Sequence, residues 1–389
     1  MMKKAICLIL LAAAAFFFRA GACAATSSAG STAPADAGRY YEEQAKESGA
    51  DRLGEQLPED TQKILKELGI DGANWSSITS VTPQNYFRKI LSVFTGKAQN
   101  PLRVLASVVA VVLLCALMDG MKLSFGEKPL GGVIGMVGTL CVCAIVVQPL
   151  VSCISDVAAV LKTASDFLLA CVPVMVAVMA AAGQSVSAGS YHLLMMAVGN
   201  VVSVFATTVL VPMMNLFLAL SVVSSVSPSV NLNGLCNVLN KAVKWIMGLG
   251  MTLFTGLVTM HSLVASSQDS TASRAAKFVV GSFVPVVGNA LGEALNTVTG
   301  CVKMLKSGIG AFGLLAGLFV FLPVIAECLL WLLTLLLSSG VSQMFGLDGI
   351  TGLLKSSADV VSTMLAILFC CMTVLIISTV VMLLIGGVS

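Results

Sequence analysis

The chain has 389 residues, of which 57% are hydrophobic and only 11% are charged. With a mean hydropathy of +0.96, this composition excludes an ordinary water-soluble globular protein and indicates an integral membrane protein. The net charge of +3 is small and no basic run with interleaved aromatic residues occurs, so nucleic acid is not an expected partner.

Residues 1–24 have the features of a secretory signal peptide. A basic pair precedes an apolar run, Ala5 to Phe18, which is too short to span a membrane and is followed by small residues. Cleavage after Ala24 would leave the mature N-terminus outside the cytoplasm. The alternative is a lipoprotein cysteine at Cys23, although Ala20 occupies the position where a larger aliphatic residue is usual.

Residues 25–100 form a predicted acidic extracytoplasmic segment. Its first part, 25–38, consists mainly of small and turn-forming residues and is expected to be disordered. Two short amphipathic helices are predicted after it, one from Glu59 to Leu68 and one from Pro83 to just before Gly96. This composition fits either a solvent-exposed flexible linker or a segment that docks an extracytoplasmic partner.

Residues 101–389 form the predicted membrane domain. A membrane-spanning helix needs about 20 apolar residues, and the intervals between charged residues are of that order. They predict seven spans, near 102–118, 133–155, 167–183, 193–223, 245–266, 311–338 and 360–385. The predicted fold class is therefore an all-α polytopic membrane protein with about seven transmembrane helices. Amphipathic or re-entrant helices and the short helical N-terminal segment complete it.

Seven spans that start outside place the C-terminus and the stretch 268–310 in the cytoplasm. The loop charges give this orientation mixed support under the positive-inside rule. Four basic residues lie just before or at the edge of the first span, on the side predicted to be outside, namely Arg88, Lys89, Lys97 and Arg103. The orientation therefore depends on the signal peptide.

The stretch 268–310 departs from simple membrane-protein composition. It begins with a polar turn that contains Arg274 and Lys277, and it then crosses an apolar break at 283–288. In the following helix-like run, 289–307, polar and aliphatic residues each recur at alternating steps of four and three, which predicts a two-sided helix. Such a helix could lie in the membrane interface or face a water-filled passage within a bundle.

Glu327 lies deep in the sixth predicted span. An ionised carboxylate there costs about 3 kcal/mol unless it is paired or hydrated, so Glu327 is expected to face the protein interior. A proton or ion site and a buried structural contact are both open interpretations. The candidate passage-lining or docking residues are Arg274, Lys277, Asn289, Glu293, Asn296, Lys303 and Glu327.

No motif for catalysis, metal or cofactor binding is found. The 12 cysteines lie mostly in apolar runs and are interpreted as packing residues, and two histidines are too few for a zinc site. Nucleotide-binding loops, metalloprotease histidine pairs and serine-hydrolase elbows are lacking. We expect no cofactor, no metal, no catalytic residue and no enzymatic activity.

The sequence of the stretch 268–310 resembles a known family. Ser273-Arg274-Ala275-Ala276-Lys277-Phe278, then Phe283-Val284-Pro285-Val286-Val287-Gly288 and Ala290-Leu291-Gly292-Glu293-Ala294, is similar to the signature region of the stage III sporulation protein AE family. The signal peptide, the acidic segment with Leu57-Pro58 and the multi-span remainder also fit that family.

The resemblance implies a non-enzymatic membrane subunit of a channel or secretion-like complex that sustains the forespore during endospore development. The implied partners are other membrane subunits, a separate ATPase subunit, and extracytoplasmic ring or forespore proteins. The implied location is the mother-cell-derived outer forespore membrane, with the N-terminus in the intermembrane space. The alternatives are a stand-alone secondary transporter with Glu327 as its coupling group, and a passive scaffold that anchors residues 25–100.

Overall fold

The computed structural model describes residues 43–70, 83–125, 130–181, 185–226, 233–283 and 288–384. For residues 261–283 and 288–304 it describes the helical backbone alone. The chain divides into two units, Met1–Glu43 and Gln44–Ser389, and the second unit contains the helical bundle. Within the described ranges the regular structure is entirely helical, which confirms the predicted all-α class.

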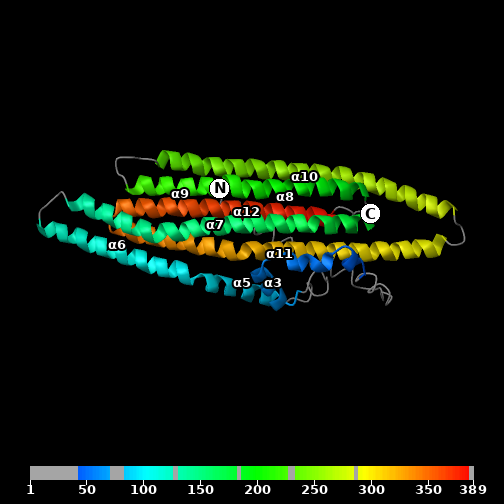
Figure 1. Cartoon of the computed structure of the whole chain (residues 1–389), viewed down its shortest axis with the longest axis horizontal. Coiled ribbons are helices and arrows are strands. Elements are labelled where there is room, and N and C mark those ends of the chain that lie inside the picture. The colour runs from blue at the N-terminus through cyan, green and yellow to red at the C-terminus, as the bar shows by residue number, and fades with distance from the viewer. Residues whose placement is uncertain are drawn as a thin grey trace. The chain divides into compact units, whose positions relative to one another are not determined.

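Long helices make up the second unit (Figure 1). In chain order the elements are η1 (Ala50–Gln56), α3 (Glu59–Glu67), α5 (Pro83–Lys97), α6 (Gln99–Phe125), α7 (Leu130–Ala181), α8 (Ser185–Val204), the π-helical η2 (Phe205–Leu210), α9 (Val211–Val226), α10 (Asn233–Phe283), α11 (Gly288–Met344) and α12 (Asp348–Leu384). Helix α7 alone has 52 residues, about 78 Å at the usual helical rise and far more than one membrane crossing needs.

Six helices in the described part of the chain are long and apolar enough to cross a membrane. The difference from the predicted seven spans arises at α7, a single helix over the predicted spans 133–155 and 167–183. Three charged residues separate those spans, and all three lie on exposed positions of α7: Asp156, Lys162 and Asp166. Because these side chains face outward, they do not interrupt the helix. Two prolines also lie inside it, Pro149 and Pro173.

Side-chain contacts fix the direction of the helices relative to one another. Lys97 and Pro101, at the junction of α5 and α6, contact Glu327 and Thr334 of α11, so these segments are parallel. Helices α10 and α12 are also parallel, since Asn240 contacts Thr363 and Met247 contacts Cys370. Helix α12 runs against α11, because Gly313 lies next to Thr379 and Gly317 next to Leu375.

The helices therefore alternate in direction between two ends of the bundle. We call the end at which α11 begins the N-terminal end, because α5 extends toward it, and the end where α6 finishes the distal end. Helices α7, α10 and α12 finish at the N-terminal end, and α8 and α11 begin there (Figure 1).

The arrangement bears on where the stretch 268–310 lies. Seven spans predict it on the opposite side of the membrane from the N-terminal segment, whereas α10 ends at Phe283 and α11 begins at Gly288 toward the N-terminal end. Because one long α7 covers two of the predicted spans, every later helix runs opposite to the direction that seven spans predict, and the side on which 268–310 lies stays a prediction.

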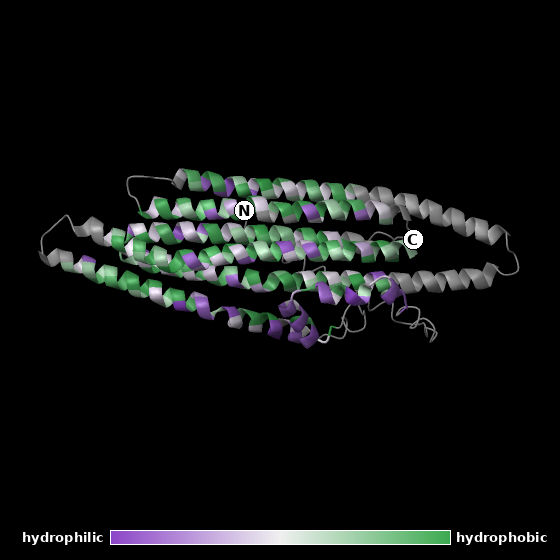
Figure 2. Cartoon of the chain, in the orientation of Figure 1, coloured by the Kyte–Doolittle hydropathy of each residue, from purple (hydrophilic) through white to green (hydrophobic). Residues whose placement is uncertain are grey.

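The acidic N-terminal segment packs on the bundle. Leu53, Ile64, Leu65 and Ile70 are buried, and the ring of Tyr86 stacks on Phe319 of α11 with centroids 6.2 Å apart. Helix α3 follows the predicted pattern, begins after Pro58 and ends before Gly69, whose positive φ of 74° favours glycine. Among the described residues, this segment thus covers part of α11 with charged helices (Figure 2).

The alternating arrangement predicts the sidedness of the turns. We expect a reporter fused between Phe283 and Gly288, or after Leu384, to report the same side of the membrane as one fused at Glu43. A reporter fused at 126–129 or 227–232 should report the opposite side, because one helix crossing separates it from the first group. Paired alkaline phosphatase and fluorescent-protein fusions measure this, and opposite sides for Glu43 and the 283–288 turn would contradict the six-helix arrangement.

Candidate functional site

The residues of the predicted two-sided helix fall into two elements of the structure. Arg274 and Lys277 belong to α10, and the candidates Asn289, Glu293, Asn296 and Lys303 belong to α11. The backbone from 288 to 307 is helical, as predicted, and the apolar break at 283–288 coincides with the interval between the two helices. The side chains at 261–304 lie outside the described residues, so the two-sided surface stays a prediction.

Glu327 lies on α11 within the apolar stretch Leu305–Met344. The amine of Lys97 donates a hydrogen bond to its carboxylate, with Nζ and Oε2 2.9 Å apart. The Glu327 side chain is 19% exposed and the Lys97 side chain 47%. Lys97 at the end of α5 therefore supplies the partner that a carboxylate in this position requires.

Lys97 also interacts with carboxylates of two other helices. The pKa of Lys97 lies above the ordinary lysine value, mainly because of the hydrogen bond to Glu327; burial opposes this shift, and the charges of Asp156 and Asp60 support it. Asp156 comes from α7 and Asp60 from α3. One ammonium group thus pairs with a carboxylate of α11 and is influenced by the charges of carboxylates on α3 and α7.

A second set of polar residues lies at the same level between α10 and α12. The hydroxyl of Thr363 donates a hydrogen bond to the side-chain oxygen of Asn240, 2.9 Å away, and Lys244 and Asp359 interact electrostatically. Together the two sets form a polar layer across the bundle: Lys97, Asp156, Glu327, Asn240, Lys244, Asp359 and Thr363. Charges of opposite sign within this layer offset the cost of placing each one among apolar helices.

Sequence reasoning singled out Glu327 but missed Lys97 and Asp156 as its neighbours. Lys97 precedes Glu327 by 230 positions, and nothing local in the sequence couples them. One feature of the sequence could have pointed to these pairs: the excess of basic residues before the first span, on the side where the positive-inside rule does not expect them. Lys97 pairs with Glu327, and Lys89 pairs with Glu67.

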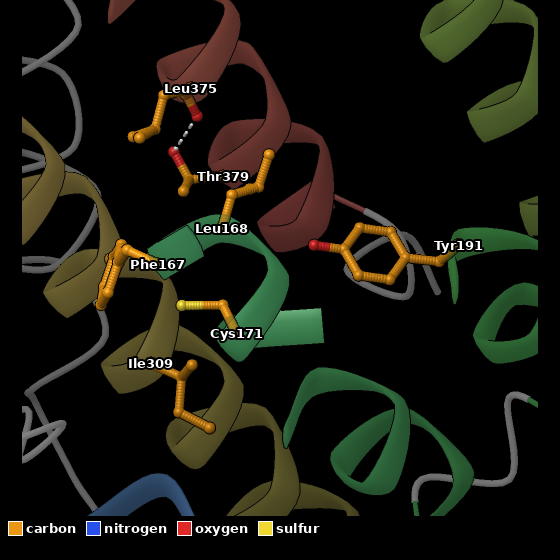
Figure 3. A pocket seen from close by; sticks show the side chains of 8 residues that line it. Phe167, Leu168, Cys171, Tyr191, Ile309, Leu375 and Thr379 are labelled. Atoms are coloured by element: carbon orange, nitrogen blue, oxygen red, sulfur yellow. Dashed lines mark hydrogen bonds between the residues drawn. The ribbon is translucent and has the colours of Figure 1, made fainter. Parts of the chain in front are cut away.

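A small cavity lies where α7, α8, α11 and α12 meet (Figure 3). Phe167 and Cys171 of α7, Ile309 of α11 and Tyr191 of α8 line it, and the hydroxyl of Thr379 is turned back to the carbonyl of Leu375. Its volume of about 10 Å³ suits a single water molecule. The lining is almost wholly apolar, so this cavity is a packing defect rather than a site for a solute.

The described residues hold no group of histidine, cysteine and carboxylate side chains that could bind a metal ion. Nine cysteines belong to the described part of the chain, and none of them is in a disulfide there. The arrangement that remains is a layer of paired charges between long apolar helices, which can fix helix register and can hold or move a proton.

The fold and the polar layer define a multi-pass helical membrane protein with a layer of interacting charged residues partway along its bundle. The sequence matches the profile of the family described as stage III sporulation protein AE over residues 74–386. The chain therefore belongs to the stage III sporulation protein AE family, and its role is in sporulation. This family is not a known class of enzymes.

A characterised relative is the stage III sporulation protein AE of Bacillus subtilis (strain 168). The two sequences are 23% identical over 257 residues, which is 66% of this chain and 63% of the relative. The match thus spans less than two thirds of the relative's length. No solved structure matches the chain.

The ion pair in the polar layer predicts a coupled effect on stability. We expect Lys97→Met to lower the free energy of unfolding by about 1–3 kcal/mol, because it leaves the mostly buried Glu327 carboxylate without its charged hydrogen bond. Adding Glu327→Leu should recover most of this loss, since an apolar pair of similar volume replaces both charges. Unfolding of the purified protein in detergent measures both.

Lys89→Met provides the matched control for that measurement. It breaks the pair with Glu67, whose side chain is 62% exposed, and we expect a change of about 0.5 kcal/mol or less. Additive losses for Lys97→Met and Glu327→Leu would show that the two side chains do not depend on each other.

Proposed function

We propose that this chain is a non-enzymatic subunit of a multi-protein membrane complex that acts between mother cell and forespore during endospore development. Its location would be the mother-cell-derived outer forespore membrane, with the N-terminal segment in the intermembrane space. Family membership supports the link to sporulation. The distribution of exposed apolar side chains supports assembly with other membrane subunits.

On α6 and α10, exposed apolar side chains form two belts that extend to different levels of the bundle. On α6 the first belt runs from Leu102 to Met121, from the polar layer toward the distal end. On α10 the second belt runs from Leu235, on the distal side of the polar layer, to Met260 toward the N-terminal end. Figure 2 shows apolar residues along both helices.

The two belts together are longer than one bilayer is thick. About 24 residues separate Lys97 from Met121 on α6, and about 20 separate Asn240 from Met260 on α10, which gives about 65 Å at 1.5 Å per residue. The hydrocarbon core of a bilayer is about 30 Å thick. A bilayer that these roughly parallel helices cross therefore covers one belt with lipid and leaves most of the other belt outside the hydrocarbon core, where it can contact protein.

An apolar surface that lipid does not cover is usually buried against another protein. The α10 belt contains small residues four apart, Gly248, Thr252 and Gly256, with open space around both glycines. The hydroxyl of Thr252 is already bonded to the carbonyl of Gly248. Such a surface lets another apolar helix approach closely, which is how a membrane subunit joins a complex.

The hairpin of α10 and α11 is the second proposed contact. It carries Arg274, Lys277, Asn289, Glu293 and Lys303, and it lies at the N-terminal end of the bundle. If the signal peptide places that end outside the cytoplasm, these residues would dock an extracytoplasmic ring or forespore partner. A separate ATPase subunit would then meet the distal end, at the α6–α7 and α9–α10 turns.

The two-belt arrangement predicts different crosslinking at two matched leucines. Leu117 on α6 is 68% exposed and Leu257 on α10 is 62% exposed. We expect a photoreactive amino acid at one of them to crosslink to lipid and at the other to crosslink to protein in membranes of sporulating cells. The buried Leu353 serves as the control that crosslinks only within the chain, and exclusive lipid adducts at both leucines would refute the proposed assembly.

A stand-alone transporter with Glu327 as its coupling group is the second candidate, because Asp156 and Lys97 lie beside that carboxylate. The double variant Lys97→Met/Glu327→Leu separates the two functions. As a structural pair these residues are replaceable by apolar ones, so we expect spore yield close to that of the parent chain. Loss of spores with normal amounts of folded protein would instead favour the transporter.

A further inference from the structure

We propose that Cys153 and Cys328 form a disulfide that ties α7 to α11 in the mature protein. Their sulfur atoms are 3.5 Å apart, and the two residues are 1% and 0% exposed. They are separated by 175 positions in the sequence, so the fold alone brings them together. The sequence interpretation of the cysteines in apolar runs as packing residues does not anticipate that these two thiols are in contact.

The geometry requires only a small change. Disulfide sulfur atoms are about 2.05 Å apart, so the two Sγ atoms must approach each other by about 1.5 Å. Rotation about the Cα–Cβ bonds moves sulfur by such amounts, because cysteine has a single side-chain torsion. No other described residue stands between the two sulfur atoms, which are already in direct contact.

The surroundings would protect the bond once it forms. Leu150, Ile154 and Val157 on α7 and Ala326 on α11 are all buried beside the two cysteines. A thiolate reductant reaches a disulfide only through solvent-accessible sulfur. For the same reason the bond must form before α7 and α11 close together, during assembly of the bundle.

The oxidation needs an electron acceptor, and we assign this role to the disulfide of an exported thiol–disulfide oxidoreductase. The thiolate of one cysteine attacks that disulfide and forms a mixed disulfide, and the second cysteine then displaces the enzyme. The Cys153–Cys328 bond forms, the enzyme's sulfur–sulfur bond breaks, and two electrons and two protons pass to the enzyme as its dithiol.

The bond would hold the two carboxylates of the polar layer in place. Cys328 adjoins Glu327, and Cys153 precedes Asp156 by less than one helical turn. With α7 and α11 covalently joined at this level, neither helix can slide past the other, and both carboxylates stay near Lys97. The proposal does not depend on the complex in which the chain acts.

Differential alkylation of the full-length chain tests whether Cys153 and Cys328 form a disulfide. Membranes from sporulating cells are denatured in the presence of N-ethylmaleimide, reduced, treated with iodoacetamide and analysed by peptide mass spectrometry. We expect Cys153 and Cys328 to carry the second label, and Cys236, also buried at 6% exposure, to carry the first. In Cys153→Ser, Cys328 should switch to the first label. N-ethylmaleimide on both cysteines of the parent chain, or Cys328 unchanged in Cys153→Ser, would overturn the proposal.

Discussion

The contact between Lys97 and Glu327 sets the arrangement of the rest of the chain. It joins the end of the charged N-terminal segment to a position within the apolar helix α11. Together with the contact between Pro101 and Thr334, it shows that α6 runs parallel to α11. The electrostatic requirement of one carboxylate among apolar side chains thus becomes a constraint on helix register across the bundle.

The same contact divides the bundle into two halves along its length. Toward the distal end, α6 presents an exposed apolar surface, whereas on the other side of the polar layer α3 and α5 cover part of α11, and η1 lies against α7. The exposed apolar surface on α10 overlaps the level of the α6 surface at Leu235 and extends beyond the polar layer to Met260. One lipid bilayer cannot cover the full length of both surfaces, and this mismatch is the basis for proposing assembly with other membrane proteins.

Each charge of the polar layer would by itself destabilise an apolar bundle, and the layer brings charges of opposite sign together. Lys97 pairs with Glu327 and is also influenced by the charges of Asp156 and Asp60, and the charge of Asp359 acts on Lys244. Partly buried pairs of this kind contribute little to net stability, but they penalise wrong registers, because a slipped helix leaves a charge without its partner. A structural role in fixing register therefore needs no transport chemistry, and neither does the small apolar cavity between α7, α8, α11 and α12.

The membrane class, the helices and the family could be read from the sequence, because each depends on local features: apolar length, helical periodicity, Gly69 as a helix terminator and the signature around Arg274 and Glu293. The need of Glu327 for a partner was equally local, since it arises from the cost of a charge in an apolar run. Only the tertiary structure decided the rest. Asp156, Lys162 and Asp166 look like a loop in the sequence, yet they face outward from one continuous α7, and this reverses the direction of all later helices. The partner of Glu327 lies 230 residues away, and packing in three dimensions, which leaves no periodic trace in a single sequence, brings it close.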